Sequence, residues 1–259
     1  MSEDPDETLA MLADLTGATD QRLRELARRA AGRLFLDLAR RGPVRPRGMG
    51  RMVEQPFRPD GGDVDLDASL DAITSASAAG EAVDPERLRV RGWSTPGTAI
   101  CLLVDRSGSM GGEPLATSAV AAAAVSWRAP ADYSVLSFGR DVVAVKSQDR
   151  SRAVEEVVDA VLALRGFGTT DVAAALEAAV DQLARSRAGR RITLLLSDCR
   201  ATEPGDVTTA AAGLDELVII APDGDSAEAV ELARAVGARV TTVTGPSHVA
   251  DAIAAVLEE

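Results

Sequence analysis

Hydrophobic positions in the second part of the chain follow two alternating patterns. Short apolar runs occur at 99–105, 133–138, 142–146, 191–198 and 216–221, and 239–243 is a sixth strand candidate. Runs of this length predict strands, and the continuous ones are typical of strands buried on both faces. Between the runs, apolar residues recur at helical spacing over 114–128, 151–163, 171–186, 206–213, 226–236 and 247–257. This alternation predicts a doubly wound α/β fold over 98–259, with helices on both faces of a mainly parallel six-stranded sheet.

One connection within this region is too short to contain a crossover helix. Only Phe138-Gly139-Arg140-Asp141 separates the second apolar run from the third. Antiparallel strands can be joined by a hairpin, whereas parallel strands need a longer connection. We therefore expect 142–146 to form an antiparallel edge strand.

The first part of the chain has a different composition. Asp4-Pro5 and Gly17 favour the start and the end of a short helix. Apolar residues at helical spacing predict a second helix over 20–41, and the Gly-, Pro- and Arg-rich stretch 42–62 predicts an extended connector. Residues 1–62 are thus expected to form a helical, Arg-rich extension with its connector.

A lead-in segment, 63–97, is expected before the α/β domain. Asp65 precedes an apolar-periodic stretch and predicts a capped helix. Residues 86–91 alternate between polar and apolar side chains, as in a strand or an extended segment.

The candidate chemistry begins where the first apolar run ends. Asp105, Ser107 and Ser109 follow that run within five residues, and Gly108 relieves the backbone between the two serines. Hard oxygen ligands on a tight loop suit a small cation such as Mg²⁺ or Mn²⁺. The carboxyl edge of a parallel sheet is also where open α/β folds place their ligands.

Two further segments complete a recognisable pattern. Thr170 precedes the helix predicted from 171, and Asp198 ends the apolar run that starts at Arg191. An Asp-x-Ser-x-Ser loop, a threonine before a helix and an aspartate after a strand, in this order, resemble the metal-ion-dependent adhesion site of von Willebrand factor type A (VWA) domains. The resemblance covers about 160 residues. Carried over position by position, it assigns as metal ligands Asp105, Ser107, Ser109, Thr170 and Asp198.

The resemblance also implies how such a site works. Both aspartates act largely through water, so the ion keeps much of its charge and an acidic residue of a protein partner completes its shell. The residues expected around that contact are Phe167, Thr169 and Arg200, although Phe167 equally suits a core position behind the loop. Where the family often has glycine after the last aspartate, this chain has Cys199-Arg200. Arg200 either lies near the ion and weakens its binding or turns outward to meet an acidic partner.

Within the family, the Asp-x-Ser-Gly-Ser-Met loop is most similar to the bacterial cytoplasmic branch with CoxE-like proteins and chelatase D-type subunits. That likeness implies an adaptor that works with a MoxR-type AAA+ ATPase in protein remodelling or metal-cofactor insertion. Two other functions stay open. One is an RNA- or ribonucleoprotein-associated scaffold of the Ro type. The other is a module that assembles with its own copies through the metal.

The composition of the chain favours some of these functions over others. His248 is the only histidine and no Gly-x-x-x-x-Gly-Lys-Ser/Thr loop occurs, so we expect neither a histidine-based enzyme nor an ATPase. The net charge of −12 argues against a protein that coats nucleic acid. Residues 21–58 nevertheless hold eleven arginines against three acidic residues. They suit a solvated helix, packing on the acidic main domain or an acidic partner better than RNA. The acidic start of the sequence and the lack of a membrane-length apolar run favour a cytoplasmic chain.

Overall fold

The computed structural model describes residues 4–16, 34–38, 51–56, 63–80, 82–106, 112–166 and 168–258. They belong to two compact units. The first unit comprises Met1–Arg45, Ala99–Ser186 and Arg191–Glu259. The second unit comprises Pro46–Thr98 and Arg187–Arg190. The described segments before residue 46 group with the first unit, and the three parts expected from the sequence stay a prediction.

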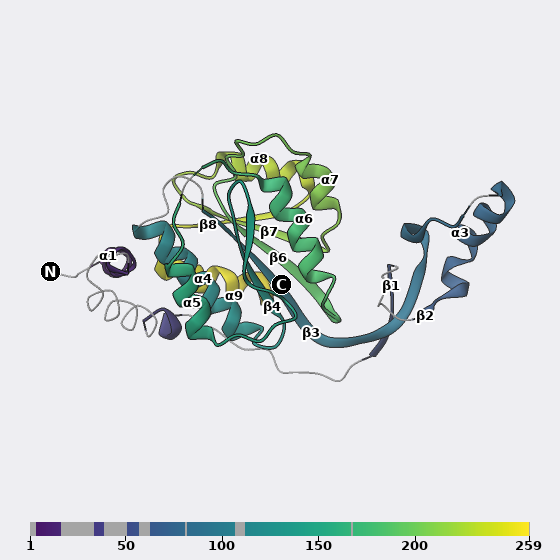
Figure 1. Ribbon diagram of the computed structural model, residues 1–259, viewed down its shortest axis with the longest axis horizontal. Coiled ribbons are helices and arrows are strands. Elements are labelled where there is room, and N and C mark those ends of the chain that lie inside the picture. The colour runs from purple at the N-terminus through teal and green to yellow at the C-terminus, as the bar shows by residue number, and fades with distance from the viewer. Residues whose placement is uncertain are drawn as a thin grey trace. The chain divides into compact units, whose positions relative to one another are not determined.

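The first unit is built on a six-stranded sheet of order β5-β4-β3-β6-β7-β8 (Figure 1). Its strands are β3 (Arg89–Asp105), β4 (Tyr133–Phe138), β5 (Val142–Lys146), β6 (Ala188–Leu196), β7 (Glu216–Pro222) and β8 (Arg239–Val243). β3 pairs in parallel with β4, and β7 pairs in parallel with both β6 and β8. β5 pairs antiparallel with β4, as the short connection predicted. The expected doubly wound, mainly parallel fold with an antiparallel edge strand is confirmed.

Helices cover both faces of this sheet (Figure 1). One face carries α4 (Gly112–Arg128), α5 (Val154–Leu162) and α9 (Pro246–Glu258). The other carries α6 (Val172–Leu183), α7 (Val207–Ala212) and α8 (Ala227–Val236). Alternate residues of β3 enter the core on the α4 face, namely Ile100, Leu102 and Val104. Small alanines line the buried part of α4, which lets the helix lie close to the sheet.

The N-terminal helix α1 (Pro5–Leu15) belongs to the same core. It begins as predicted, because the Asp4 carboxylate accepts a hydrogen bond of 3.0 Å from the amide of Asp6. Leu9 and Ala13 are buried among the core residues, and α1 contacts α4 and α9. Residues 34–38 are helical and bury Phe35 and Leu38 in the same core. Apolar packing therefore holds these segments on the first unit.

The second unit contains β1 (Arg51–Pro56), β2 (Asp63–Val64), α3 (Leu66–Ala79), the 3-10 turn η1 (Pro85–Arg87) and the first half of β3. β1 pairs antiparallel with β3, from Arg51 opposite Ser94 to Pro56 opposite Arg89. Residues 51–56 of the expected extended connector are thus extended, and their backbone completes a ladder with β3. The predicted cap is confirmed, because the Asp65 carboxylate accepts a hydrogen bond of 3.3 Å from Ala68.

Lys146, the only lysine of the chain, is buried at the end of β5. Its ammonium group donates hydrogen bonds to the carbonyls of Tyr133 and Ser147 and lies 4.0 Å from the centroid of the Tyr133 ring. Burial lowers the pKa of Lys146, against the opposing effect of Asp132 and Asp149. Backbone carbonyls and an aromatic face thus replace water around this charge.

Among the described helices, none is both long and apolar enough to span a bilayer.

Candidate functional site

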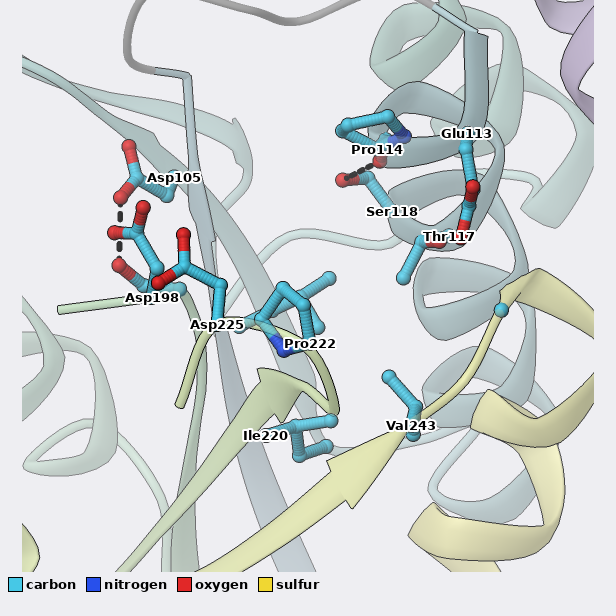
Figure 2. Close-up of a pocket in the computed structure, with 13 residues that line it drawn as sticks. Asp105, Glu113, Pro114, Thr117, Ser118, Asp198, Ile220, Pro222, Asp225 and Val243 are labelled. Atoms are coloured by element: carbon cyan, nitrogen blue, oxygen red, sulfur yellow. Dashed lines mark hydrogen bonds between the residues drawn. The ribbon is translucent and has the colours of Figure 1, made fainter. Parts of the chain in front are cut away.

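The two predicted aspartates lie at the same edge of the sheet. Asp105 is the last residue of β3, and Asp198 follows the end of β6, the neighbouring strand. Between them, the hydroxyl of Ser197 donates a hydrogen bond of 2.6 Å to Oδ2 of Asp105 (Figure 2). Ser197 is only 6% exposed, so this contact is shielded from solvent. The sheet therefore brings both carboxylates together and fixes the orientation of one of them.

A tight turn holds Asp198. The amide of Arg200 donates a hydrogen bond of 3.0 Å to Oδ1 of Asp198, and the amide of Cys199 donates one of 2.9 Å to the hydroxyl of Ser197. Cys199 has a φ of 63°, in the left-handed region that glycine favours. The backbone at residue 199 thus has the left-handed conformation that glycine adopts most easily. The family often has glycine at this position, whereas this chain has cysteine.

Thr170 is buried and its backbone is held on both sides. Its amide donates a hydrogen bond of 2.7 Å to the hydroxyl of Thr202, and its carbonyl accepts from the amides of Thr202 and Glu203. Asp171 then caps α6 by accepting a hydrogen bond of 2.9 Å from the amide of Ala174. The hydroxyl of Thr170 has no hydrogen-bond partner among the residues that the structure describes, which leaves its oxygen available as a ligand.

The loop that carries Thr170 meets the loop after β3 at Gly139. A Cβ atom placed on Gly139 would lie 3.3 Å from the carbonyl oxygen of Thr169 and 3.5 Å from Cγ of Arg106. The amide of Asp171 also donates a hydrogen bond of 2.9 Å to the carbonyl of Gly139. The β4–β5 hairpin therefore lies in contact with both loops and sets their separation.

Three of the predicted site residues fall outside the described part of the chain: Ser107, Ser109 and Phe167. Thr169 is half-buried beside Thr170. Arg200 is exposed, and its guanidinium forms an ion pair of 2.5 Å with Asp225 and lies 3.8 Å from Glu228. Its charge is thus directed to these two carboxylates. The ligand and partner-binding assignments of these residues stay predictions.

A cavity of about 350 Å³ opens beside Asp105 and Asp198. In Figure 2, Asp225 lies close to the two aspartates, Glu113 and Thr117 lie on α4 across the cavity, and hydrophobic side chains lie lower in the cavity. Its lining includes Leu196, Ile220, Pro222 and Val243. Sequence reasoning missed Asp225 and Glu113. The principle that ligand-binding residues follow the carboxyl ends of strands identified Asp198 and could also have identified Asp225, which follows β7.

The donor set fits a hard divalent cation. Two aspartates and a threonine hydroxyl offer oxygen atoms, which Mg²⁺ and Mn²⁺ prefer. Burial raises the pKa of the Cys199 thiol to about 12, and the charge of Asp198 adds to the effect. The sulfur beside the site therefore stays protonated at neutral pH and is a poor ligand. Among the described residues, no three His, Cys, Asp or Glu side chains cluster as in an all-carboxylate or thiolate site.

Comparison with known families settles the relationship. The model of the family described as "VWA domain containing CoxE-like protein" matches residues 38–221, well over half of the chain. The chain belongs to this CoxE-like VWA family. The match includes β3 and the predicted metal-ligand positions, and it ends within β7. It begins after α1 and ends before α9.

Solved structures similar to this CoxE-like chain are distant in sequence. A von Willebrand factor type A protein from Catenulispora acidiphila is 17% identical with a TM-score of 0.48, covering 65% of this chain and 43% of its own. Proximal thread matrix protein 1 from the mussel byssus, solved with a zinc-occupied MIDAS motif, is 13% identical with a TM-score of 0.49, covering 63% and 48%.

Manganese-loaded TRAP protein from Plasmodium vivax is 17% identical with a TM-score of 0.48. That match covers 62% of this chain and 72% of the TRAP chain. The chain spans less than half the length of the mussel and Catenulispora proteins. No curated protein matches this sequence.

Proposed function

We propose that this chain is a non-enzymatic, Mg²⁺-dependent protein-binding adaptor that works with a MoxR-type AAA+ ATPase in protein remodelling or metal-cofactor insertion. The observation that carries the proposal is the pairing of Asp105 and Asp198 at adjacent strand ends, with Ser197 orienting the first carboxylate. Membership of the CoxE-like family supports the ATPase partnership. In this role the protein is bacterial and cytoplasmic.

The ion would be held by Asp105, Asp198 and Thr170, together with Ser107 and Ser109 from the loop after β3. When bound, it supplies a positive charge with a coordination position open to an outside oxygen. Three of the five ligands are neutral hydroxyls, so much of that charge remains for an acidic residue of the partner. Thr169, Arg200 and Phe167 lie in sequence next to the ligands and would contact the partner around that residue.

Electrostatics favour contact through the ion over long-range attraction. The chain carries a net charge of −12, and Asp225 and Glu113 line the cavity beside the two aspartates. An acidic partner surface is therefore repelled at a distance and attracted only where the ion meets its carboxylate. Moderate salt should weaken the complex little, because it screens that repulsion as well.

The chemistry of the described side chains supports an adaptor over an enzyme. His248, near the start of α9, has its Nδ1 atom 3.0 Å from the hydroxyl of Thr244. It belongs to the N-terminal turn of a helix and lines no part of the cavity. Cys101, like Cys199, has a thiol whose pKa burial raises to about 12. Neither thiol is activated as a nucleophile.

The test combines a metal titration with a binding assay. Asp105→Ala should abolish Mg²⁺ binding in calorimetry without unfolding the chain by circular dichroism. Asp181→Ala, which removes an exposed carboxylate from α6, should bind Mg²⁺ like the wild type. Binding to the MoxR-type ATPase of the same organism, measured by biolayer interferometry, should require Mg²⁺ and vanish in EDTA.

Two results would overturn parts of the proposal. Unchanged Mg²⁺ affinity in Asp105→Ala would remove the metal-site assignment. ATPase binding that survives EDTA at full affinity would move the interface away from Asp105, Thr170 and Asp198.

A further inference from the structure

The cavity beside the two strand-end aspartates has an apolar floor. Leu196, Ile220 and Val243 line it from the carboxyl ends of β6, β7 and β8, and all three belong to the main core. The strand register places Leu196 opposite Ile220, and Pro222 opposite Val243. Because Ile220 and Pro222 are two residues apart on one strand, they face the same side of the sheet. The floor is therefore a continuous apolar row across three strands.

The first turns of α4 form the wall across the cavity (Figure 2). The hydroxyl of Ser118 donates a hydrogen bond of 2.8 Å to the carbonyl of Pro114, so its polar group is satisfied within the helix. The Pro114 ring and Thr117 line the same wall. Among the lining residues that the structure describes on α4, only Glu113 carries a charge. This wall thus adds carbon surface to the apolar floor.

Acidic groups gather at the other end of the cavity. Figure 2 shows Asp225 close to Asp105 and Asp198. The carboxylate of Asp225 forms an ion pair of 2.5 Å with Arg200, and that of Asp105 accepts a hydrogen bond from Ser197. Three carboxylates at one end repel an anion. An anionic group of a ligand is therefore attracted to this end only when a cation is bound to Asp105 and Asp198.

The size of the cavity limits what it can hold. Its volume is about 350 Å³. Pockets that bind small molecules span roughly 300–1,000 Å³, so this cavity lies at the lower end of that range. It suits a single branched side chain better than a nucleotide-sized cofactor. An apolar side chain that fills it would also remove the apolar floor from water, which favours binding.

We infer that the cavity binds a branched apolar side chain of the protein partner, of leucine or isoleucine size, next to the partner carboxylate that meets the ion. This inference rests on the metal site of the proposed function, and it names the chemistry of the partner: an acidic residue with an apolar neighbour. An acidic residue alone would leave the floor formed by Leu196, Ile220 and Val243 uncovered. A basic residue would be repelled by the bound ion.

The experiment titrates capped peptides into the full chain at saturating Mg²⁺ and follows the methyl resonances of Leu196, Ile220 and Val243. Acetyl-Leu-Asp-Leu-amide should shift these resonances. Acetyl-Ala-Asp-Ala-amide keeps the carboxylate but lacks the branched side chains, so it should bind about tenfold more weakly, or worse. Acetyl-Leu-Asn-Leu-amide keeps the branched side chains but lacks the charge. It should bind about tenfold more weakly than the aspartate peptide, and with the same affinity in EDTA.

Two variants locate the binding. Thr117→Phe adds a ring to the α4 wall and should weaken both leucine peptides about tenfold, because the ring occupies the space of the apolar side chain. Thr208→Phe places the same ring at an exposed position of α7 and should bind both peptides like the wild type. Since the asparagine peptide does not depend on the ion, its weaker binding to Thr117→Phe reports on the cavity and not on the metal site.

The remaining outcomes separate this inference from the metal site. Equal binding of the leucine and alanine aspartate peptides, with Mg²⁺ binding intact in calorimetry, would overturn the cavity assignment and leave the metal site standing. The same holds if no peptide shifts the three methyl resonances, or if Thr117→Phe binds like the wild type. If the asparagine peptide binds while EDTA leaves the aspartate peptide unaffected, the metal site fails and the apolar cavity stands. Tighter binding of free 4-methylpentanoate than of the leucine peptides would assign the cavity to a small acid and overturn the docking of a protein segment.

Discussion

The hydroxyl of Ser197, directly after β6, donates a 2.6 Å hydrogen bond to the carboxylate of Asp105 at the end of β3. The same hydroxyl accepts from the amide of Cys199, so its proton is directed toward Asp105. One serine thereby connects the two strand ends that carry Asp105 and Asp198, the proposed acidic ligands. In the proposed metal site, Ser197 would orient a ligand without itself being one, and motif matching leaves out residues of this kind.

Ser197→Ala should lower Mg²⁺ affinity about tenfold, because Asp105 loses the group that orients it. Calorimetry measures the change. Ser186→Ala is the matched control, since the Ser186 hydroxyl donates to Oδ2 of Asp132 in the same way, beside the amino end of β4. Both variants lose a hydrogen bond to a carboxylate, and only the first should alter metal binding. Equal affinities in the two variants would contradict the orienting role.

Thr170→Ala should weaken Mg²⁺ binding about tenfold or more, because it removes a buried hydroxyl that the other described residues leave unbonded. Thr169→Ala should leave Mg²⁺ affinity unchanged and weaken only the complex with the protein partner. A titration of both variants, followed by partner binding at saturating Mg²⁺, distinguishes the two roles. The opposite pattern would show that the ligand is Thr169.

Cys199→Gly should be more stable than Cys199→Ala by about 1 kcal/mol, because only glycine adopts a φ of 63° without strain. Both variants remove the thiol, so the comparison isolates the backbone. Thermal unfolding should show a melting temperature roughly 2–4 °C higher for the glycine variant. Equal melting temperatures would mean that the turn relaxes when the side chain is shortened.

Cys101 should resist alkylation in the folded chain. Burial raises the pKa of its thiol to about 12 from 9.0, so about one molecule in ten thousand carries the thiolate at pH 8. Iodoacetamide should therefore label Cys101 only after unfolding, which mass spectrometry of the Cys199→Ala variant would detect. Labelling of the folded variant at the rate of a free thiol would refute the assignment.

The same shift affects stability at alkaline pH. Between pH 9.0 and 12 the unfolded thiol of Cys101 loses its proton while the folded thiol keeps it. The free energy of unfolding therefore falls as pH rises through this interval. Cys101→Ala should show a shallower fall in a denaturant titration across the same pH range.

The local pattern of apolar and polar residues was sufficient to predict the sheet and most of the helices that pack on it. The strand candidates read from the sequence included all six strands of the first unit. A strand buried on both faces, such as β4, needs apolar side chains at successive positions, whereas β5 and β8 are partly exposed and gave a weaker pattern. Because parallel strands end at the same edge of a sheet, the sequence also predicted that Asp105 and Asp198 lie together. The Asp65 cap was also found from sequence, since a cap depends on residues next to each other in the chain.

Features that depend on distant pairing were not found. Gly92, Pro96 and Gly97 interrupt the apolar pattern before Ala99, so the strand or extended segment expected over 86–91 was not joined to the strand expected from 99. Its ladder with β1 supplies hydrogen bonds that no local pattern reveals. The docking of α1 was missed for the same reason, because nothing in its own sequence specifies α4 and α9 as the surface that buries Leu9 and Ala13.

The burial of Lys146 decides which reagents and modifying enzymes can act on this protein. With the sole lysine only 5% exposed beside the Tyr133 ring, lysine acetylation, lysine methylation and lysine-directed cross-linkers have no accessible side-chain target on the folded chain. The sequence carries 40 aspartates and glutamates instead. Cross-linking that maps how this chain meets its partner should therefore couple carboxylates, and charge-altering modification would have to act on acidic, hydroxyl or arginine side chains.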